Sequence, residues 1–229
     1  MSRPFAVVVG AGPGVGAAFA RRLGEQGYGV GLVARDVARL EDLAASLRAD
    51  GVDVRVAGGD VADADSLGQA VGERARAGGR LDVLHYNPSR WRSGGAPEVS
   101  AADLLDDLAV GTAGMLTAVR AGLPFLLDGG GTVTATGSGA ADRPMRGGLT
   151  LGVQKAALRA LVRGLAAELT PQGVHVATVT VRGTIAPGTP LAPDAVAGAL
   201  YGLVTETAGP ADGWTTELEL TRSGARPLS

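Results

Sequence analysis

Short apolar runs alternate with longer segments of helical periodicity along most of the chain. The first run, Phe5-Ala-Val-Val-Val9, has no polar residue at alternate positions, which is typical of a strand buried on both faces. The strands that the pattern predicts are residues 5–9, 30–34, 52–56, 81–86, 132–136, 174–181 and 215–220. The helices that it predicts are residues 15–27, 37–49, 63–77, 101–127, 147–170 and 193–207.

Strands that alternate with helices of this length predict βαβ units, whose strands pair in parallel. The expected fold class is α/β, a three-layer sandwich around a doubly wound, mostly parallel sheet of about seven strands. The chain has 229 residues, a length that one domain can reach. Because no break in composition and no internal repeat divides the chain, we expect a single domain over residues 1–229.

The longest predicted helix, over residues 101–127, carries signals for its start and for an irregularity. Ser100 and Asp103 have the spacing of a capping box. Glycines at 111 and 114 and a proline at 124 predict a bend or a break inside the helix.

Composition and charge exclude several functions. The formal net charge is −2, so the basic footprint of a nucleic-acid-binding protein is absent from the sequence. The chain has no cysteine and two histidines, His85 and His175, and we expect no disulfide and no metal site. Residues 4–20 carry no charge but contain glycines and a proline and are shorter than the roughly 20 apolar residues of a membrane span. We therefore expect a soluble, cytoplasmic protein that binds neither nucleic acid nor membrane.

A glycine-rich loop follows the first predicted strand and leads directly into a helix. Its sequence is Gly10-Ala-Gly-Pro-Gly-Val-Gly16. Glycines let the backbone approach a pyrophosphate closely, and the start of the next helix offers free N–H groups to that anion. We expect a dinucleotide cofactor here, held by Gly10, Gly12, Gly14, Val15 and Gly16.

The end of the second predicted strand bears on the choice of cofactor. A carboxylate at this position would hold the ribose 2′-hydroxyl of NAD, whereas a nearby arginine suits the 2′-phosphate of NADP. The residue here is Ala34, followed by Arg35, so NADP(H) is favoured over NAD(H). Asp36 keeps NAD(H) open, and a plain helix cap at Asp36 with a solvated Arg35 is the structural alternative.

Further motifs follow in order: Asp60-Val61, then Asn87-Pro-Ser89 after the fourth strand, Ser138 after the fifth strand, and Lys155. With these motifs the chain resembles the short-chain dehydrogenase/reductase family over nearly its whole length. The resemblance implies a Rossmann-type fold, with Asp60, Val61 and Asn87 beside the cofactor. It also implies that Ser138 and Lys155 occupy the positions of the catalytic serine and lysine.

The departures from the family pattern concern catalysis. Leu151 stands where the family has its catalytic tyrosine, one helical turn before Lys155, and Gly111 aligns with the family's asparagine. Arg182-Gly183 replaces the family's Pro-Gly, and the short segment that follows predicts a truncated substrate lid after about residue 183.

Lys155 is the only lysine among 21 basic residues, which favours a retained role in binding the nicotinamide ribose over a surface position. Tyr86 is the only tyrosine near the inferred cleft and is a candidate for the missing acid, although packing beneath the cofactor is the stronger interpretation. His85 is interpreted as a core residue. Trp91 could stack on a flat substrate, and Arg90 or Arg92 could hold an anion.

Three functions remain open. The first is an oxidoreductase that transfers hydride from NADP(H) to a small imine, enone or carbonyl compound without a tyrosine acid. The second is a non-redox cyclase or isomerase, and the third is a catalytically silent NADP(H)-binding protein. The family's habit of pairing its long helices implies a homodimer or homotetramer.

Overall fold

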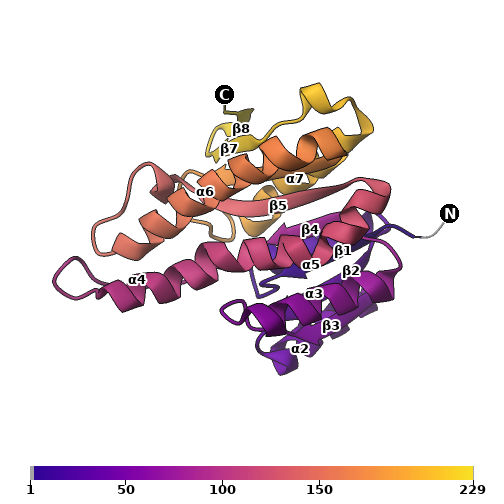
Figure 1. The fold of residues 1–229 in the computed structure, drawn as a ribbon, viewed down its shortest axis with the longest axis horizontal. Helices are drawn as coiled ribbons and strands as arrows, with labels where there is room; N and C mark the ends of the chain where they lie inside the picture. The colour runs from indigo at the N-terminus through magenta and orange to yellow at the C-terminus, as the bar shows by residue number, and fades with distance from the viewer. Residues whose placement is uncertain (1–2, 229) are drawn as a thin grey trace.

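The computed structural model describes residues 3–228, and its strands form one sheet in the order β3-β2-β1-β4-β5-β6-β7-β8 (Figure 1). The strands are β1 (Phe5–Val9), β2 (Gly29–Ala34), β3 (Val54–Gly58), β4 (Val83–Tyr86), β5 (Gly131–Ser138), β6 (Val174–Val181), β7 (Glu217–Thr221) and β8 (Gly224–Pro227). The α-helices are α1 (Val15–Glu25), α2 (Val37–Ala49), α3 (Ala64–Gly78), α4 (Ala101–Leu108), α5 (Gly114–Gly129), α6 (Leu149–Leu169) and α7 (Pro193–Thr205).

The sheet is parallel from β3 to β7, and only β8 runs antiparallel to its neighbour β7. The expected α/β class with a doubly wound, mostly parallel sheet is confirmed. The strand order reverses between β1 and β4, and ligands of such sheets bind outside the carboxyl ends of the strands at this point. The sequence did not predict β8, because its four residues are all exposed and end in a proline, which an edge strand tolerates.

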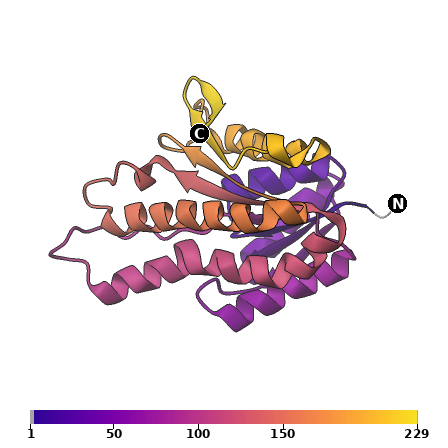
Figure 2. The same cartoon turned by 45° about the horizontal axis from the view of Figure 1, so that its top comes forward.

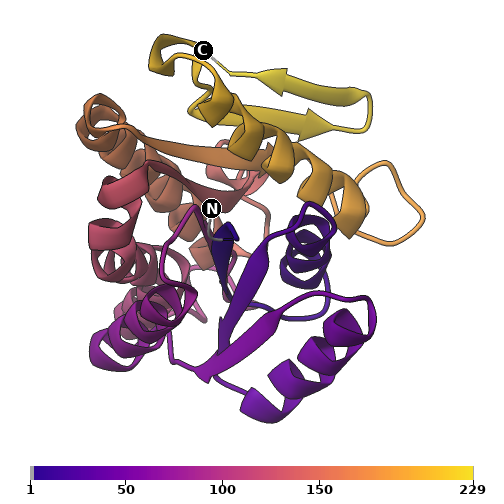
Figure 3. The ribbon, with the colours of Figure 1, turned by 90° about the vertical axis from the view of Figure 1, so that its right-hand side faces the viewer.

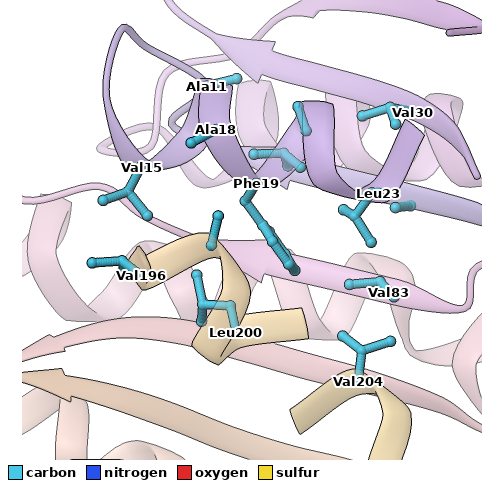
Figure 4. Close-up of a cluster of buried hydrophobic side chains, with 14 of the residues drawn as sticks. Ala11, Val15, Ala18, Phe19, Leu23, Val30, Val83, Val196, Leu200 and Val204 are labelled. Atoms are coloured by element: carbon cyan, nitrogen blue, oxygen red, sulfur yellow. The ribbon is translucent and has the colours of Figure 1, made fainter. Parts of the chain in front are cut away.

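Helices cover both faces of the sheet (Figures 2 and 3). Alternate residues of β1 belong to the two cores: Ala6 and Val8 pack with α1, α2 and α7, whereas Val7 and Val9 pack with α3, α5 and α6. Figure 4 shows Phe19 of α1 reaching from its helix toward Leu200 of α7. These two layers hold the strand ends rigidly in place, which fixes the loops that carry the candidate site.

The long helical segment is interrupted by one π-helical stretch, η1 (Ala109–Ala113), between α4 and α5. The irregularity predicted near residues 111–114 is confirmed, and α5 continues through Pro124 without ending. Ser100 forms the predicted capping box with Asp103.

The segment Ala101–Gly129 is long and apolar enough, by length and composition alone, to cross a membrane. However, 44% of its most apolar stretch is buried within the protein, and Met115 and Leu126 are fully buried. The burial is that of a helix in the core of an α/β protein.

Candidate active site

The glycine loop between β1 and α1 is closed on one side and open on the other. A Cβ at Gly16 would lie 2.8 Å from the Gly10 carbonyl oxygen, so the loop packs against itself there. A Cβ at Gly12 or at Gly14, whose φ is +125°, would meet nothing within 4 Å. The start of α1 has no side-chain cap and no acidic residue in its first turn. Open space above glycines, next to uncapped helix N–H groups, fits the phosphates of a dinucleotide.

Two neighbouring charged residues after β2, Arg35 and Asp36, have different surroundings. Asp36 caps α2 by accepting a hydrogen bond from the Arg39 backbone N–H at 3.1 Å, and it also pairs with the Arg39 side chain at 3.3 Å. Arg35 is exposed and makes no hydrogen bond or ion pair to any residue between 3 and 228. It lines two cavities, of about 580 and 470 Å³, which also share Gly12 and Ala34 in their linings.

The two residues of the Asp60-Val61 pair have different surroundings. The Asp60 carboxylate accepts a hydrogen bond from the Ala62 N–H at 3.0 Å, and Asp60 is not part of the cavity lining. Val61 lines the 470 Å³ cavity together with Asn87. Asp60 therefore shapes the turn after β3, whereas Val61 forms part of the wall.

A central cavity of about 700 Å³ lies where the glycine loop, β5, α6 and the segment after β6 meet. Its lining brings together Asn87, Ser138, Leu151 and Lys155, which are far apart in the sequence. The remaining lining residues are Pro13, Gly14, Val15, Ser89, Thr136, Gly137, Val181, Gly183, Ile185, Pro187 and Pro193. A larger cavity of about 930 Å³ lies between α6 and β7, and it contains none of the predicted site residues.

Lys155 is only 5% exposed, and its Nζ donates a hydrogen bond to the Thr136 carbonyl oxygen at 2.8 Å. Burial lowers the pKa of its ammonium group from 10.5 to about 8. The Thr136 hydroxyl donates to the Asn87 side chain at 2.8 Å, and the Asn87 amide donates to the Gly10 carbonyl at 3.1 Å. A continuous chain of contacts thus connects Lys155 with the glycine loop.

His85 lies behind this chain of contacts. Its Nδ1 is 2.9 Å from the Thr134 hydroxyl and its Nε2 is 3.4 Å from the Thr136 hydroxyl. Burial lowers the pKa of His85 to about 3, so the ring is neutral. The interpretation of His85 as a core residue is confirmed.

Tyr86 is 1% exposed and does not line the central cavity. Its hydroxyl donates a 2.6 Å hydrogen bond to the Val110 carbonyl oxygen in the π-helical stretch. Burial raises the pKa of the phenol well above its usual range. These contacts contradict the interpretation of Tyr86 as a catalytic acid, because its proton is donated to the Val110 carbonyl and its side chain is not part of the cavity lining.

No sequence pattern pointed to Gln154 as a residue of the site. Its side-chain oxygen accepts a hydrogen bond from the Arg90 N–H at 3.1 Å, and its amide donates to the Arg90 carbonyl at 3.0 Å. A Cβ at Gly111 would lie 2.8 Å from Cγ and 2.9 Å from Cβ of Gln154. Gln154 therefore fills the space that a side chain at position 111 would need.

The arginines of the segment after β4 are paired rather than free. Arg92 forms two hydrogen bonds, at 2.9 and 3.0 Å, with the buried carboxylate of Asp107, and Arg90 lies 3.7 Å from the same carboxylate. Arg92 also pairs with Asp103 at 2.6 Å. The alternative in which these arginines hold a substrate anion is not supported. Trp91, 56% exposed, lies against Gly148 at the start of α6.

A group of ion pairs that no sequence pattern predicted holds the strand ends around Ser138. Arg182, directly after β6, bonds to Asp142 and to the buried Glu219, both at 2.5 Å. Asp142 also pairs with Arg159 of α6. The two arginines keep the pKa of the Asp142 carboxyl low, at about 2. The turn after β5, helix α6 and the end of β6 are thereby tied together.

The fold and the central cavity define a doubly wound α/β protein with a ligand cleft at the carboxyl ends of its strands. Residues 4–193 match the family model described as short chain dehydrogenase. An uncharacterized oxidoreductase from Mycobacterium tuberculosis is 33% identical over 171 residues, which span 73% of this chain and 64% of that protein. The chain belongs to the short chain dehydrogenase family, as its resemblance implied.

Solved structures share this fold almost completely. A metagenomic short-chain oxidoreductase in complex with NADP is 27% identical, with a TM-score of 0.86 over 96% of this chain and 97% of that chain. An NADPH-bound short chain oxidoreductase from Pseudomonas aeruginosa PAO1, described as containing an atypical catalytic center, is 22% identical. Its TM-score is 0.86 over 98% of both chains, a likeness that shows the shared fold.

Proposed function

We propose that this protein is an NADP(H)-dependent reductase that transfers hydride to a small imine, enone or carbonyl compound without a tyrosine acid. The observation that carries the proposal is the central cavity. It joins the glycine loop at the uncapped start of α1 to Ser138 and Lys155, and Leu151 lines it one turn before the lysine.

The cofactor preference rests on Arg35. The usual carboxylate position holds Ala34, and the Asp36 carboxylate is already engaged in capping α2, which leaves the Arg35 guanidinium available for a 2′-phosphate. The metagenomic short-chain oxidoreductase in complex with NADP, 27% identical to this chain, supports the same cofactor class. Binding would place Gly12, Gly14 and the start of α1 at the pyrophosphate and Val61 and Asn87 along the adenosine half.

When bound, the reduced nicotinamide supplies a hydride. Lys155 would hold the nicotinamide ribose hydroxyls, and the Ser138 hydroxyl would hydrogen-bond the substrate oxygen or nitrogen. Both residues line the central cavity, which supports these roles. The Ser138 oxygen accepts from the Ala140 N–H at 3.2 Å, so its own proton remains available to a substrate. The lining around them is mostly apolar, which favours an uncharged or weakly polar substrate.

Leu151 favours a second candidate function. Its alkyl side chain can neither donate nor accept a proton, and losing a general acid costs about 10²–10⁴-fold in rate. A non-redox cyclase or isomerase, or a silent NADP(H)-binding protein, would retain the cofactor cleft without needing that acid.

We also propose one domain with a short lid, formed by residues 182–192 between β6 and α7, and a homodimer or homotetramer. Large apolar side chains on the helices near the site support assembly, because they are exposed in the single chain. They are Leu105, Leu116, Leu149 and Val153. A cytoplasmic location stays a prediction from the sequence.

Consumption of NADPH against a panel of imines, enones and ketones tests the proposed function. We expect saturable NADPH oxidation with at least one of these compounds, with reduced product formed in equal amount. The cofactor-binding control is calorimetry without substrate. Tight NADPH binding with no oxidation on any compound would move the assignment to the second candidate function.

A further inference from the structure

We propose that Lys155 is itself the proton donor of this reductase, in the role that a tyrosine at position 151 would otherwise take. The inference rests on the proposed function, because it concerns the group that protonates the reduced substrate. It also narrows the substrate class to ketones and enones, whose reduction is completed only when a proton arrives.

The lining of the central cavity leaves few sources for that proton. Lys155 is the one residue with a titratable side chain among the described residues that line it. The other polar side chains there are Asn87, Ser89, Thr136 and Ser138, whose amides and hydroxyls are much weaker acids than an ammonium group. The nearest alternatives, His85 and Tyr86, are buried outside the lining and are hydrogen-bonded there.

The position of Nζ leaves protons available. An ammonium group has three donors: the Lys155 group spends one on the Thr136 carbonyl and would spend another on a nicotinamide ribose hydroxyl, which leaves one for a substrate. Leu151, one turn earlier on the same helix, places an alkyl side chain where no competing donor can stand. Among the described residues that line the cavity with Ser138, Lys155 therefore carries the one acidic group that a substrate oxygen can meet.

No nearby carboxylate of the described chain stabilises the protonated form of Lys155 and so raises its pKa. Three carboxylates around α6 are held in ion pairs with arginines: Asp107 of α4 with Arg90 and Arg92, Glu217 of β7 with Arg159 and Arg163, and Asp142 with Arg159 and Arg182. Asp106 of α4 is exposed. No carboxylate between residues 3 and 228 lies within ion-pair distance of Nζ. His85, the titratable group that faces Lys155 from β4, is neutral. Burial without an ion pair lowers the pKa of Lys155 to about 8, close to the pH at which a general acid works best.

A hydride supplied by bound nicotinamide would form the C–H bond on the substrate carbon and leave the electron pair of the C=O bond on oxygen. One Nζ–H bond of Lys155 then breaks and an O–H bond forms, which yields the alcohol and a neutral amine. Water that enters the cavity returns a proton to the amine, so the enzyme is restored with NADPH oxidised and the ketone reduced.

Two substrates of different proton demand test this role. A ketone needs a proton, whereas an N-alkylated iminium ion becomes a neutral amine with the hydride alone. Lys155→Arg keeps a cation with hydrogen-bond donors but releases no proton near neutral pH. We expect ketone reduction to fall by about a hundredfold or more in this variant. Iminium reduction needs only the cofactor-binding role of this residue and should fall by much less, so the ratio of ketone to iminium turnover should drop by about tenfold or more. Lys155→Met should lose activity with both.

The pH dependence of kcat tests the same role of Lys155. The protonated amine is the active form, so kcat for the ketone should fall as pH rises above about 8 in the wild type, while kcat for the iminium ion should not. An equal loss of both reactions in Lys155→Arg would overturn the role, because it would mean that Lys155 only positions the cofactor.

A measurement independent of activity uses the fact that the chain has a single lysine. Protein labelled with ¹³C at the lysine ε-carbon should give one side-chain NMR signal, and we expect it to titrate with a midpoint near pH 8. A midpoint near the usual value of 10.5 would overturn the proposal. If the wild type reduces the iminium ion but not the ketone, the proposed function stands and the role of Lys155 falls. If it reduces neither, both fall.

Discussion

Arg35 and Arg39 lie one turn apart beside the same cavity, and their surroundings differ. The Arg39 guanidinium is paired with Asp36, whereas Arg35 has no such partner in the described chain. A charge that is already neutralised contributes less to binding an added phosphate than one that is not. The two residues therefore form a matched pair for testing cofactor choice.

We expect Arg35→Ala to weaken NADPH binding by roughly tenfold or more, which corresponds to the loss of a charge-assisted hydrogen bond. NADH binding should change little, because NADH has no 2′-phosphate. Arg39→Ala is the control and should have the smaller effect on NADPH. Calorimetric titration of each variant with both cofactors measures this, and parallel losses for NADPH and NADH would contradict it.

Gly111 and Gly164 are both helical glycines with opposite surroundings. A Cβ at Gly111 would press on Gln154, which is fixed by its two bonds to Arg90, whereas a Cβ at Gly164 would meet nothing within 4 Å. We expect Gly111→Ala to lower the free energy of unfolding by about 1–3 kcal/mol. Gly164→Ala should raise it by roughly 0.5–1 kcal/mol, since alanine loses less backbone entropy. Urea denaturation measures both, and equal effects would argue against the crowding by Gln154.

At the scale of elements, ion pairs tie the strand ends around Ser138 together in addition to the apolar packing of the core. Arg182 connects the end of β6 to Asp142 after β5 and to Glu219 in β7. Glu219 is 4% exposed, so removing one of its partners leaves a buried carboxylate less well compensated. Arg226 reaches the same carboxylate from the exposed strand β8.

Arg182→Met should therefore lower the free energy of unfolding by about 1–3 kcal/mol, because a buried charged group loses a hydrogen-bond partner. Arg226→Ala, at a side chain that is 72% exposed, should cost less than about 1 kcal/mol. Guanidinium denaturation combined with NADPH titration separates stability from binding. A larger cost for Arg226→Ala would show that the hairpin, not the strand ends, depends on Glu219.

The elements that sequence patterns predicted well are those whose pattern arises from local burial. The prediction of β6 agrees with the structure at both ends because residues 174–181 are all buried. By contrast, β8 buries nothing and left no signal. The same division holds in the site. The glycine loop, Ser138 and Lys155 are recognisable by type and spacing, but Gln154 acts through a residue 64 positions away, which no local pattern reports.

At the scale of the whole molecule, the candidate site residues lie where the order of the strands reverses. The glycine loop follows β1, Asn87 follows β4, and Ser138 ends β5, so the segments at the carboxyl ends of three neighbouring strands meet at one cleft. Because the two helix layers bury both faces of these strands, the cleft is positioned by most of the core rather than by its own loops. For this reason, alternating strands and helices were enough to predict the fold class. Which group could take the role of the missing tyrosine could be judged only from the side-chain contacts.

In the π-helical stretch, the number of residues is constrained as strongly as their identity. Removing one residue from Ala109–Ala113 would restore ordinary winding and turn α5 by about 100° around its axis. Gly114, whose lack of a side chain makes room for the Tyr86 hydroxyl, and Gly122, which does so for Leu81, would then face elsewhere. Homologues that keep these two glycines should therefore neither gain nor lose a residue in this stretch.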